Sequence, residues 1–292
     1  MKTILSRKGF DSQNGGIPSP ILHENGEYKF LPLPIPFEDG IKFSEVLLLK
    51  DKTALDIINE LNPNLKLKSE YCHLDPDLIK HNLLHRSNDW KPSFGQINQA
   101  QVHLSNEGIS ENDLFLFFGW FKFAEIVKGK INFSKEKNQE YPNGFHAIFG
   151  YLQVDKVFPV NNKNNIENWL TNHPHIKYKI KDNLDNNTIY TAKDYFTFDK
   201  SIKGAGYLKF STNCILSAKG NKRSLWELPN YFHPQNGIIL TYNPDRNWDL
   251  VKNKSILNSA KIGQEFVFKK DLKNEIQKWS INLIKNNKIG SS

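Results

Sequence analysis

The chain has 292 residues, of which 38% are hydrophobic and 12% aromatic, and its 39 Lys and Arg against 31 Asp and Glu give a formal charge of +8. This composition excludes a disordered chain, and no apolar run approaches the roughly 20 residues that a membrane-spanning helix needs. The N-terminal apolar stretch is too short for a signal peptide, so we expect a cytoplasmic globular protein. The basic excess favours a polyanionic partner such as nucleic acid.

The first predicted elements surround a loop rich in Gly and Pro. Residues 2–6 and 28–36 have the composition of short strands, and prolines end the second one. Together they predict a hairpin-like unit around the loop. Further along, apolar residues recur at helical spacing over 53–61, where Thr53 is placed to cap the N-terminus of a helix.

The strongest strand signals come in the middle of the chain. Residues 113–123 and 144–154 are dense in aromatic and branched side chains, and we expect them to pair as central strands. The Lys- and Asn-rich segment between them is expected to be an exposed hairpin-like excursion. Shorter strands are predicted at 187–192, 206–211, 237–242 and 264–268, followed by an amphipathic helix over 272–287.

These elements favour the α+β class. We expect a single compact domain over residues 1–292, with a central, mostly antiparallel sheet, for which a barrel-like form is one option, and a C-terminal helix. The two cysteines, Cys72 and Cys214, lie in unrelated contexts and support neither a disulfide framework nor a cysteine zinc site.

The loop "SRKGFDSQNGG" at residues 6–16 combines groups that suit a binding site. Arg7 and Lys8 are suited to phosphates, Gly15 and Gly16 to a close backbone approach, and Asp11 to catalysis as a carboxylate. A structural turn in which Asp11 caps a backbone amide explains the same residues equally well. The spacing matches neither a Walker loop nor a dinucleotide fingerprint, so no nucleotide cofactor is expected.

The segment "HLDPDL" places Asp75 and Asp77 two residues apart, which in an extended chain puts both carboxylates on one side. Such a pair serves as metal ligands or as acid and base, although an Asp-Pro-Asp turn is often only structural. His73, His81 and His85 lie nearby, yet none of the spacings is a strong metal motif. We therefore expect no metal and no cofactor.

Two further stretches carry polar groups that suit a nucleic-acid site. "FGQINQAQVHL" contains Gln96, Gln101 and His103, and glutamine pairs a donor with an acceptor as the edge of a base does. A polar helix surface is the alternative. "HPH" sets His173 and His175 on one side of a turn, where they suit phosphate contact or proton transfer; an ordinary surface turn is the competing interpretation.

With these stretches side by side, the chain resembles the third type of the nucleotide modification associated domain family. The resemblance rests on motifs that run in order from residue 6 to residue 267: "SRKGFDSQNGGIPSPIL", "HLDPDL", "FGQINQAQVHL", "DLFLFFGWF", "HAIFGYLQV", "HPH", "NTIY", "WELP" and "GQEFV". The family is linked to modified DNA bases and phage loci. The resemblance therefore implies a substrate context, DNA with modified bases, and leaves the reaction open.

In that context the residues favour a DNA N-glycosylase that excises a modified base from phage DNA, because hydrolysis needs no cosubstrate loop and only a few groups. Asp11 is the first candidate for the catalytic carboxylate. The other candidate catalytic residues are Asp75, Asp77 and His103. The candidate substrate-binding residues are Arg7, Lys8, Gly15, Gly16, Ser19, Gln96, Gln101, Trp120, Tyr151, His173 and His175.

Two other functions stay open at this point. A non-catalytic reader would grip the modified base and leave every glycosidic bond intact. An enzyme that installs the modification would require a small-molecule cosubstrate, for which the sequence offers no Gly-rich loop.

Overall fold

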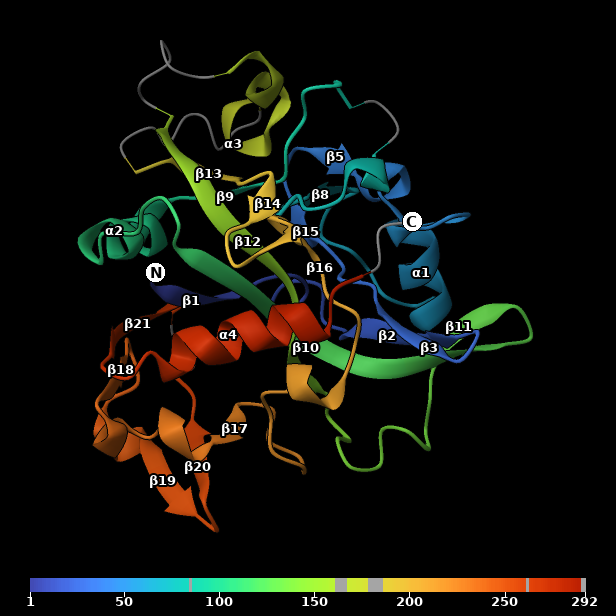
Figure 1. The fold of residues 1–292 in the computed structure, drawn as a ribbon. Helices are drawn as coiled ribbons and strands as arrows, with labels where there is room; N and C mark the ends of the chain where they lie inside the picture. Colours follow the sequence, from blue (N-terminus) through green and yellow to red (C-terminus); the bar gives the residue numbers. More distant parts are fainter. Residues whose placement is uncertain (84–85, 161–166, 178–185, 261–262, 290–292) are drawn as a thin grey trace.

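The computed structural model describes residues 1–83, 86–160, 167–177, 186–260 and 263–289 (Figure 1). Its centre is the antiparallel pair of two long strands, β10 (Leu114–Val127) and β12 (Phe145–Pro159). The first ten residues of β12 and most of the first eleven of β10 are buried, as expected for strands dense in Phe, Leu and Ile. The prediction of these two central strands is confirmed.

The other strands of the large sheet flank this pair in the order β18-β21-β1-β10-β12-β13-β9. The pairs of β10 with β1 and β2 are parallel and the remaining pairs antiparallel, so the sheet is mixed. Among the described residues the backbone ladder does not close into a barrel. The strands beside β10 and β12 are β1 (Thr3–Arg7), β2 (Ser19–Glu24), β3 (Glu27–Phe30), β9 (Ser93–Gln96), β11 (Lys130–Phe133), β13 (Thr188–Ala192), β16 (Ala205–Tyr207), β18 (Ile238–Leu240) and β21 (Glu265–Asp271).

The opening loop, residues 8–18, is an excursion from one edge of β10. β1 pairs with β10 up to Arg7 opposite Phe118, and β2 resumes the pairing with Ser19 opposite Phe121. Eleven residues of the loop therefore correspond to only two residues of β10. The predicted hairpin around the loop is wrong, because β10 is long enough to pair with β1 and β2 end to end, and β2 forms its hairpin with β3 instead.

Four helices surround the sheet in the described part of the chain: α1 (Ala54–Leu61), α2 (Asn98–Asn106), α3 (Pro174–Lys177) and α4 (Glu275–Asn286). The predicted capping of α1 by Thr53 and the predicted C-terminal helix are both confirmed. In Figure 1 α4 crosses in front of the sheet, and it contacts β1 and β21. No helix among the described residues is long and apolar enough to span a membrane.

The β10–β11 hairpin and several small sheets pack around the centre of the large sheet. The hairpin of β10 with β11 is less exposed than expected, since Ile131 is buried and Glu60 of α1 accepts a hydrogen bond from its amide. The small sheets are formed by β4 (Ile35–Phe37), β5 (Ile41–Lys42) and β8 (Tyr71–His73); by β6 (Leu47–Leu49) and β7 (Lys52–Thr53); by β14 (Tyr195–Phe196) and β15 (Asp199–Lys203); and by β17 (Leu225–Pro229), β19 (Trp248–Val251) and β20 (Lys254–Asn258).

Alternation along β1 sends neighbouring side chains to opposite faces of the sheet. Arg7 lies over the rings of Phe118 and Phe266 on one face, whereas Lys8 lies over the ring of Phe94 on the other. The last residue of β1 and the first residue of the opening loop thus supply one cation to each face, and each cation belongs to a different polar cluster.

Candidate functional site

The opening loop forms one wall of a cleft of about 440 Å³. Residues 7–13 line this wall, and residues 221–224, Trp120 and His146 line the other sides. The loop can leave the sheet here because Gly119 has no side chain; a Cβ at that position would lie 2.8 Å from the carbonyl oxygen of Lys8. We call this hollow the opening-loop cleft. Its volume lies in the range of small-molecule sites, about 300–1,000 Å³.

Two arginines and a tryptophan dominate the cleft. The guanidinium of Arg223 stacks over the Trp120 ring at 4.3 Å from its centroid, and it donates to Ser12 Oγ at 3.1 Å. The guanidinium of Arg7 donates to the carbonyl oxygen of Ala260 at 3.1 Å. Burial lowers the pKa of both arginines, and the nearby charge of Arg223 lowers that of Arg7 further. A pair of partly desolvated cations beside an aromatic ring suits an anionic, planar ligand.

Asp11 lies in the cleft and also organises the loop. Its Oδ1 accepts from the backbone amides of Gln13 and Asn14, both at 2.7 Å, and the Asn14 side chain donates to both carboxylate oxygens. These are the contacts of an Asx-type turn. At the same time Asp11 is close enough to Arg7 and Arg223 to oppose the lowering of their pKa values. The position of Asp11 therefore suits both expectations: Asp11 caps the loop, and its carboxylate lies at the cleft.

The remaining loop residues set its shape. Gly15 has a φ of +100°, and a Cβ there would lie 2.2 Å from the buried ring of Phe10, so only glycine fits. Gly16 is exposed, also with a positive φ. Ser19 is buried at the end of the loop, where its hydroxyl accepts from the amide of Leu33 at 3.0 Å.

His146 at the floor of the cleft gives a pH prediction. Its Nδ1 accepts from Trp226 Nε1 at 3.0 Å, and burial, together with Arg7 and Arg223, lowers its pKa well below the ordinary value. The unfolded chain therefore binds a proton below about pH 6.5 that the folded chain does not bind.

We expect the free energy of unfolding to fall as the pH drops from 7 to 5, by at most about 1.4 kcal/mol per pH unit from this one residue. Urea unfolding of wild type and His146→Gln at both pH values measures the effect. The variant should have the shallower pH dependence, while His81→Gln, at an exposed position, should match wild type. Equal slopes for wild type and His146→Gln would contradict the assignment.

On the opposite face, Lys8 belongs to a buried network around Glu265. Glu265 Oε1 accepts from Lys8 Nζ at 2.9 Å, from Gln96 Nε2 at 2.6 Å and from Ser6 Oγ at 3.0 Å. The Glu265 side chain is fully buried and that of Lys8 is 10% exposed. β9 is one end of the strand order and β21 lies next to the other end, so the bond from Gln96 to Glu265 connects two strands that are far apart in that order.

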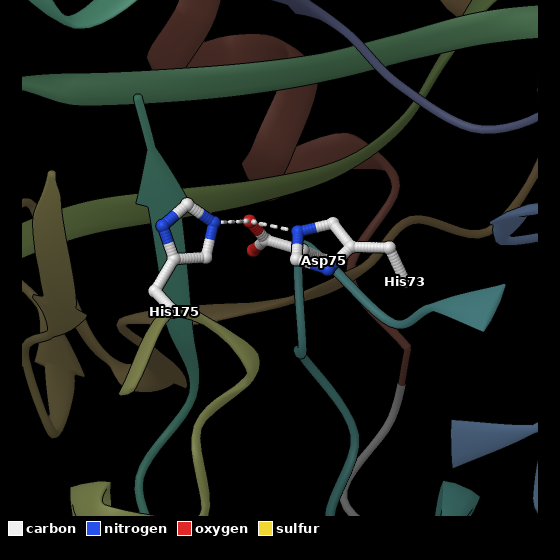
Figure 2. Close-up of side chains that lie close together, drawn as sticks. All are labelled: His73, Asp75 and His175. Carbon is white, nitrogen blue, oxygen red and sulfur yellow. Dashed lines mark ion pairs between the residues drawn. The ribbon is translucent and has the colours of Figure 1, made fainter. Parts of the chain in front are cut away.

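A second polar cluster lies beside this network and consists of His73, Asp75 and His175 (Figure 2). The carboxylate of Asp75 lies between the two imidazoles; its Oδ2 is 3.4 Å from His73 Nε2 and 3.3 Å from His175 Nε2. The amide of Gly95 donates to both carboxylate oxygens at 3.0 Å. Burial opposes the ionisation of Asp75, but its interactions with His175 and His73 outweigh this effect and lower its pKa. We call these three residues the His-Asp-His cluster.

Asp77 has different partners from Asp75. Arg86 clasps its carboxylate through two contacts of 2.6 Å, and Trp90 Nε1 lies 3.4 Å away. Burial raises the pKa of Asp77 to about 6, against the effect of Arg86. His173 lies next to this ion pair, and its Nδ1 accepts from the amide of His175 at 3.2 Å. Asp77, Arg86 and His173 line a separate cleft of about 590 Å³.

Three predicted site residues lie elsewhere. Gln101 is buried between the hydroxyls of Ser105 and Tyr190. His103, on the same helix, bonds Thr241 Oγ1 at 3.1 Å, and burial lowers its pKa. The Tyr151 hydroxyl donates to the carbonyl oxygen of Lys203, and burial raises its pKa. None of the three lines the opening-loop cleft.

The structure therefore gathers most of the predicted residues in four places. Arg7, Asp11 and Trp120 meet in the opening-loop cleft, and Lys8 reaches both the cleft and the buried network of Gln96. Asp75 and His175 meet in the His-Asp-His cluster, whereas Asp77 and His173 line the separate cleft. His85 lies outside the described residues, and His81 is exposed.

Several residues of these sites carried no signal in the sequence analysis. Among them are Gly95 and His146, and each contacts a partner far away in the chain: Gly95 donates to Asp75, and His146 accepts from Trp226. Gly95 is the clearest case, because a Cβ at this position would lie 2.3 Å from the His175 ring. The signal that could have revealed Gly95 is a glycine inside a predicted strand, because such a glycine often marks a site where another group approaches the backbone closely.

The fold and these sites define an α+β protein with a cationic, aromatic cleft where the opening loop leaves a mixed sheet between β1 and β2. Residues 2–269 match the family described as nucleotide modification associated domain 3, so the chain belongs to that family. No curated protein and no solved structure matches the chain significantly. Family membership associates the chain with nucleotide modification, and thereby with nucleic acid, as the resemblance implied.

Proposed function

We propose that this chain is a DNA N-glycosylase that binds a modified base in the opening-loop cleft and hydrolyses its bond to the sugar. The observation that carries the proposal is the meeting of Arg7, Arg223, Trp120 and Asp11 in one cleft of about 440 Å³. The two cations suit the phosphates on either side of an extruded nucleotide, and the guanidinium of Arg223 stacked on Trp120 offers a flat surface for the base.

In the proposed reaction Asp11 acts on the sugar. Its carboxylate stabilises positive charge as the bond between C1′ and the base nitrogen breaks, as in other glycoside hydrolysis. A water oxygen bonds to C1′ and gives a proton to Asp11, while the electron pair of the broken bond stays on the base nitrogen. The base nitrogen takes up one proton from solvent, and Asp11 afterwards returns its proton to solvent. The products are the free base and an abasic site, and no cosubstrate takes part.

The other carboxylates suit this reaction less well. Asp75 is 4% exposed, and the cavity beside it has a volume of only about 20 Å³, which has no room for a base. Asp77 is clasped by Arg86 through both oxygens. Lys8 is paired with Glu265, so the phosphate role that the sequence analysis gave to Lys8 passes to Arg7 and Arg223 in this proposal.

The proposal is tested on phage DNA. The folded protein is incubated with DNA that carries hypermodified bases and with the unmodified counterpart, and released bases are measured by mass spectrometry together with alkali-labile sites. We expect release from the modified DNA alone, without any added small molecule. Folded protein that releases no base from either DNA would overturn the enzymatic proposal, and activity that requires a cosubstrate would point instead to installation of the modification.

A specific observation favours a second candidate, a non-catalytic reader of the modified base. Both oxygens of Asp11 accept hydrogen bonds within its own loop, which is what a purely structural cap does. A reader would bind modified DNA more tightly than unmodified DNA through the same two arginines. It would leave every glycosidic bond intact after prolonged incubation, and binding measured beside base release separates the two functions.

A further inference from the structure

The protonation of His175 is fixed by Asn187. The Asn187 Nδ2 donates to the carbonyl oxygen of His175 at 2.9 Å, which directs its Oδ1 to His175 Nδ1 at 2.7 Å. His175 Nδ1 therefore carries a hydrogen, and in the neutral ring Nε2 carries a lone pair. That lone pair faces Oδ2 of Asp75. Two hydrogen-bond acceptors that face each other repel unless a proton or a metal ion lies between them.

The distances fit a metal ion better than a shared proton. A charge-assisted hydrogen bond between imidazolium and carboxylate is typically about 2.7–2.9 Å long. The two contacts with Asp75 Oδ2 are 3.3 and 3.4 Å. Ligands at about 2.0–2.2 Å from a tetrahedral Zn²⁺ are about 3.3–3.6 Å apart, which matches both contacts. In the octahedral sites that Fe²⁺ prefers, neighbouring ligands at similar bond lengths are only about 3.0 Å apart.

The surroundings have the features of a built metal site. All three ligand atoms lie within 4.8 Å of one another, and their side chains are 11%, 4% and 2% exposed for His73, Asp75 and His175. Asn187 orients His175, and the amide of Gly95 holds the carboxylate, as outer partners do in metalloproteins. The charge of Lys8, which acts on His73, is paired with Glu265.

Three protein ligands would leave a fourth coordination position for a water molecule. Of the three residues, Asp75 also lines a hollow of about 20 Å³, which is enough for one water molecule, whereas neither histidine lines it. Three protein ligands with an open fourth position are typical of catalytic zinc sites, whereas structural sites have four protein ligands. We propose that His73, Asp75 and His175 bind one Zn²⁺ ion with a water molecule as fourth ligand. This site is separate from the opening-loop cleft and does not depend on the glycosylase proposal.

The test begins with the full chain freed of metal by chelation. Zn²⁺ is added in competition with a chromophoric chelator, and Co²⁺ is added separately as a spectroscopic probe. We expect one Zn²⁺ per chain, an intense tetrahedral Co²⁺ spectrum, and a melting temperature that rises with Zn²⁺ but not with Mg²⁺. A folded chain that binds no Zn²⁺, or that gives the weak spectrum of octahedral Co²⁺, would overturn the proposal.

Variants of the proposed ligands and their partners test where the Zn²⁺ ion binds. His73→Gln, at the least buried ligand, should weaken Zn²⁺ binding at least about 100-fold, and Asn187→Ala about 10–100-fold. His81→Gln, at an exposed histidine close in sequence, should bind Zn²⁺ as wild type does. Binding that His73→Gln leaves unchanged would place the ion elsewhere and contradict the assignment. If a variant fails to fold, the stoichiometry and the Co²⁺ spectrum of the wild type still decide.

Discussion

The Asp11→Asn variant is expected to release modified bases at least about 100-fold more slowly than the wild type, because a positioned carboxylate contributes roughly 100- to 10,000-fold to such reactions. Asparagine retains an Oδ1 atom that accepts from the amides of Gln13 and Asn14, so the loop should keep its shape. Only the negative charge is lost. Base release under single-turnover conditions measures the rate of the chemical step.

The same variant distinguishes catalysis from capping. Removal of a negative charge beside Arg7 and Arg223 should leave DNA affinity unchanged or slightly higher, since Asp11 interacts favourably with both cations. Asp51→Asn, at an exposed position, is the matched control and should behave as wild type. A rate of Asp11→Asn equal to that of wild type would remove Asp11 from the reaction and leave it the role of a cap.

The second large effect is expected at Glu265. Glu265→Ala should lower the free energy of unfolding by about 3–5 kcal/mol, because it leaves the charge of Lys8 enclosed without its partner. It also removes the acceptor through which Gln96 joins β9 to β21. Urea unfolding measures the change, and Glu136→Ala, at an exposed position, should be within about 0.5 kcal/mol of wild type.

A double variant separates the lost charge pair from lost packing. Lys8→Met with Glu265→Met removes both charges at similar volume, and buried ion pairs are often replaced by apolar residues without loss of stability. We expect the double variant to be clearly more stable than Glu265→Ala. A double variant as unstable as Glu265→Ala would mean that the network stabilises the sheet through its hydrogen bonds and not through charge pairing.

The sequence predicted elements whose signal is local. Residues 113–123 and 144–154 form strands because their own Phe, Leu and Ile content suits a buried pleated surface, and Thr53 caps α1 through residues of the same turn. The choice of strand partners is not local. β1 pairs with β10 and β21, which lie far along the chain, so a hairpin inferred from neighbouring strands was wrong.

The same distinction applies to the sites. Arg7 and Asp11 were predictable because both lie in the short stretch of residues 6–16, close to the Gly and Pro residues that shape the opening loop. Arg223 reaches the cleft only through the packing of residues 221–224 beside Trp120. The His-Asp-His cluster combines two motifs, "HLDPDL" and "HPH", each of which alone suits an ordinary turn, and only the packing of α3 on β9 brings His175 to Asp75.

The most direct test of the central claim is the mass of a defined DNA duplex with one modified base after incubation with the folded wild-type protein. The account predicts that the modified strand loses the base and gains a hydroxyl group at C1′, which leaves an abasic site, while the same duplex with an unmodified base keeps its mass. A modified strand that keeps its full mass although the protein binds it would contradict the glycosylase proposal and favour the reader.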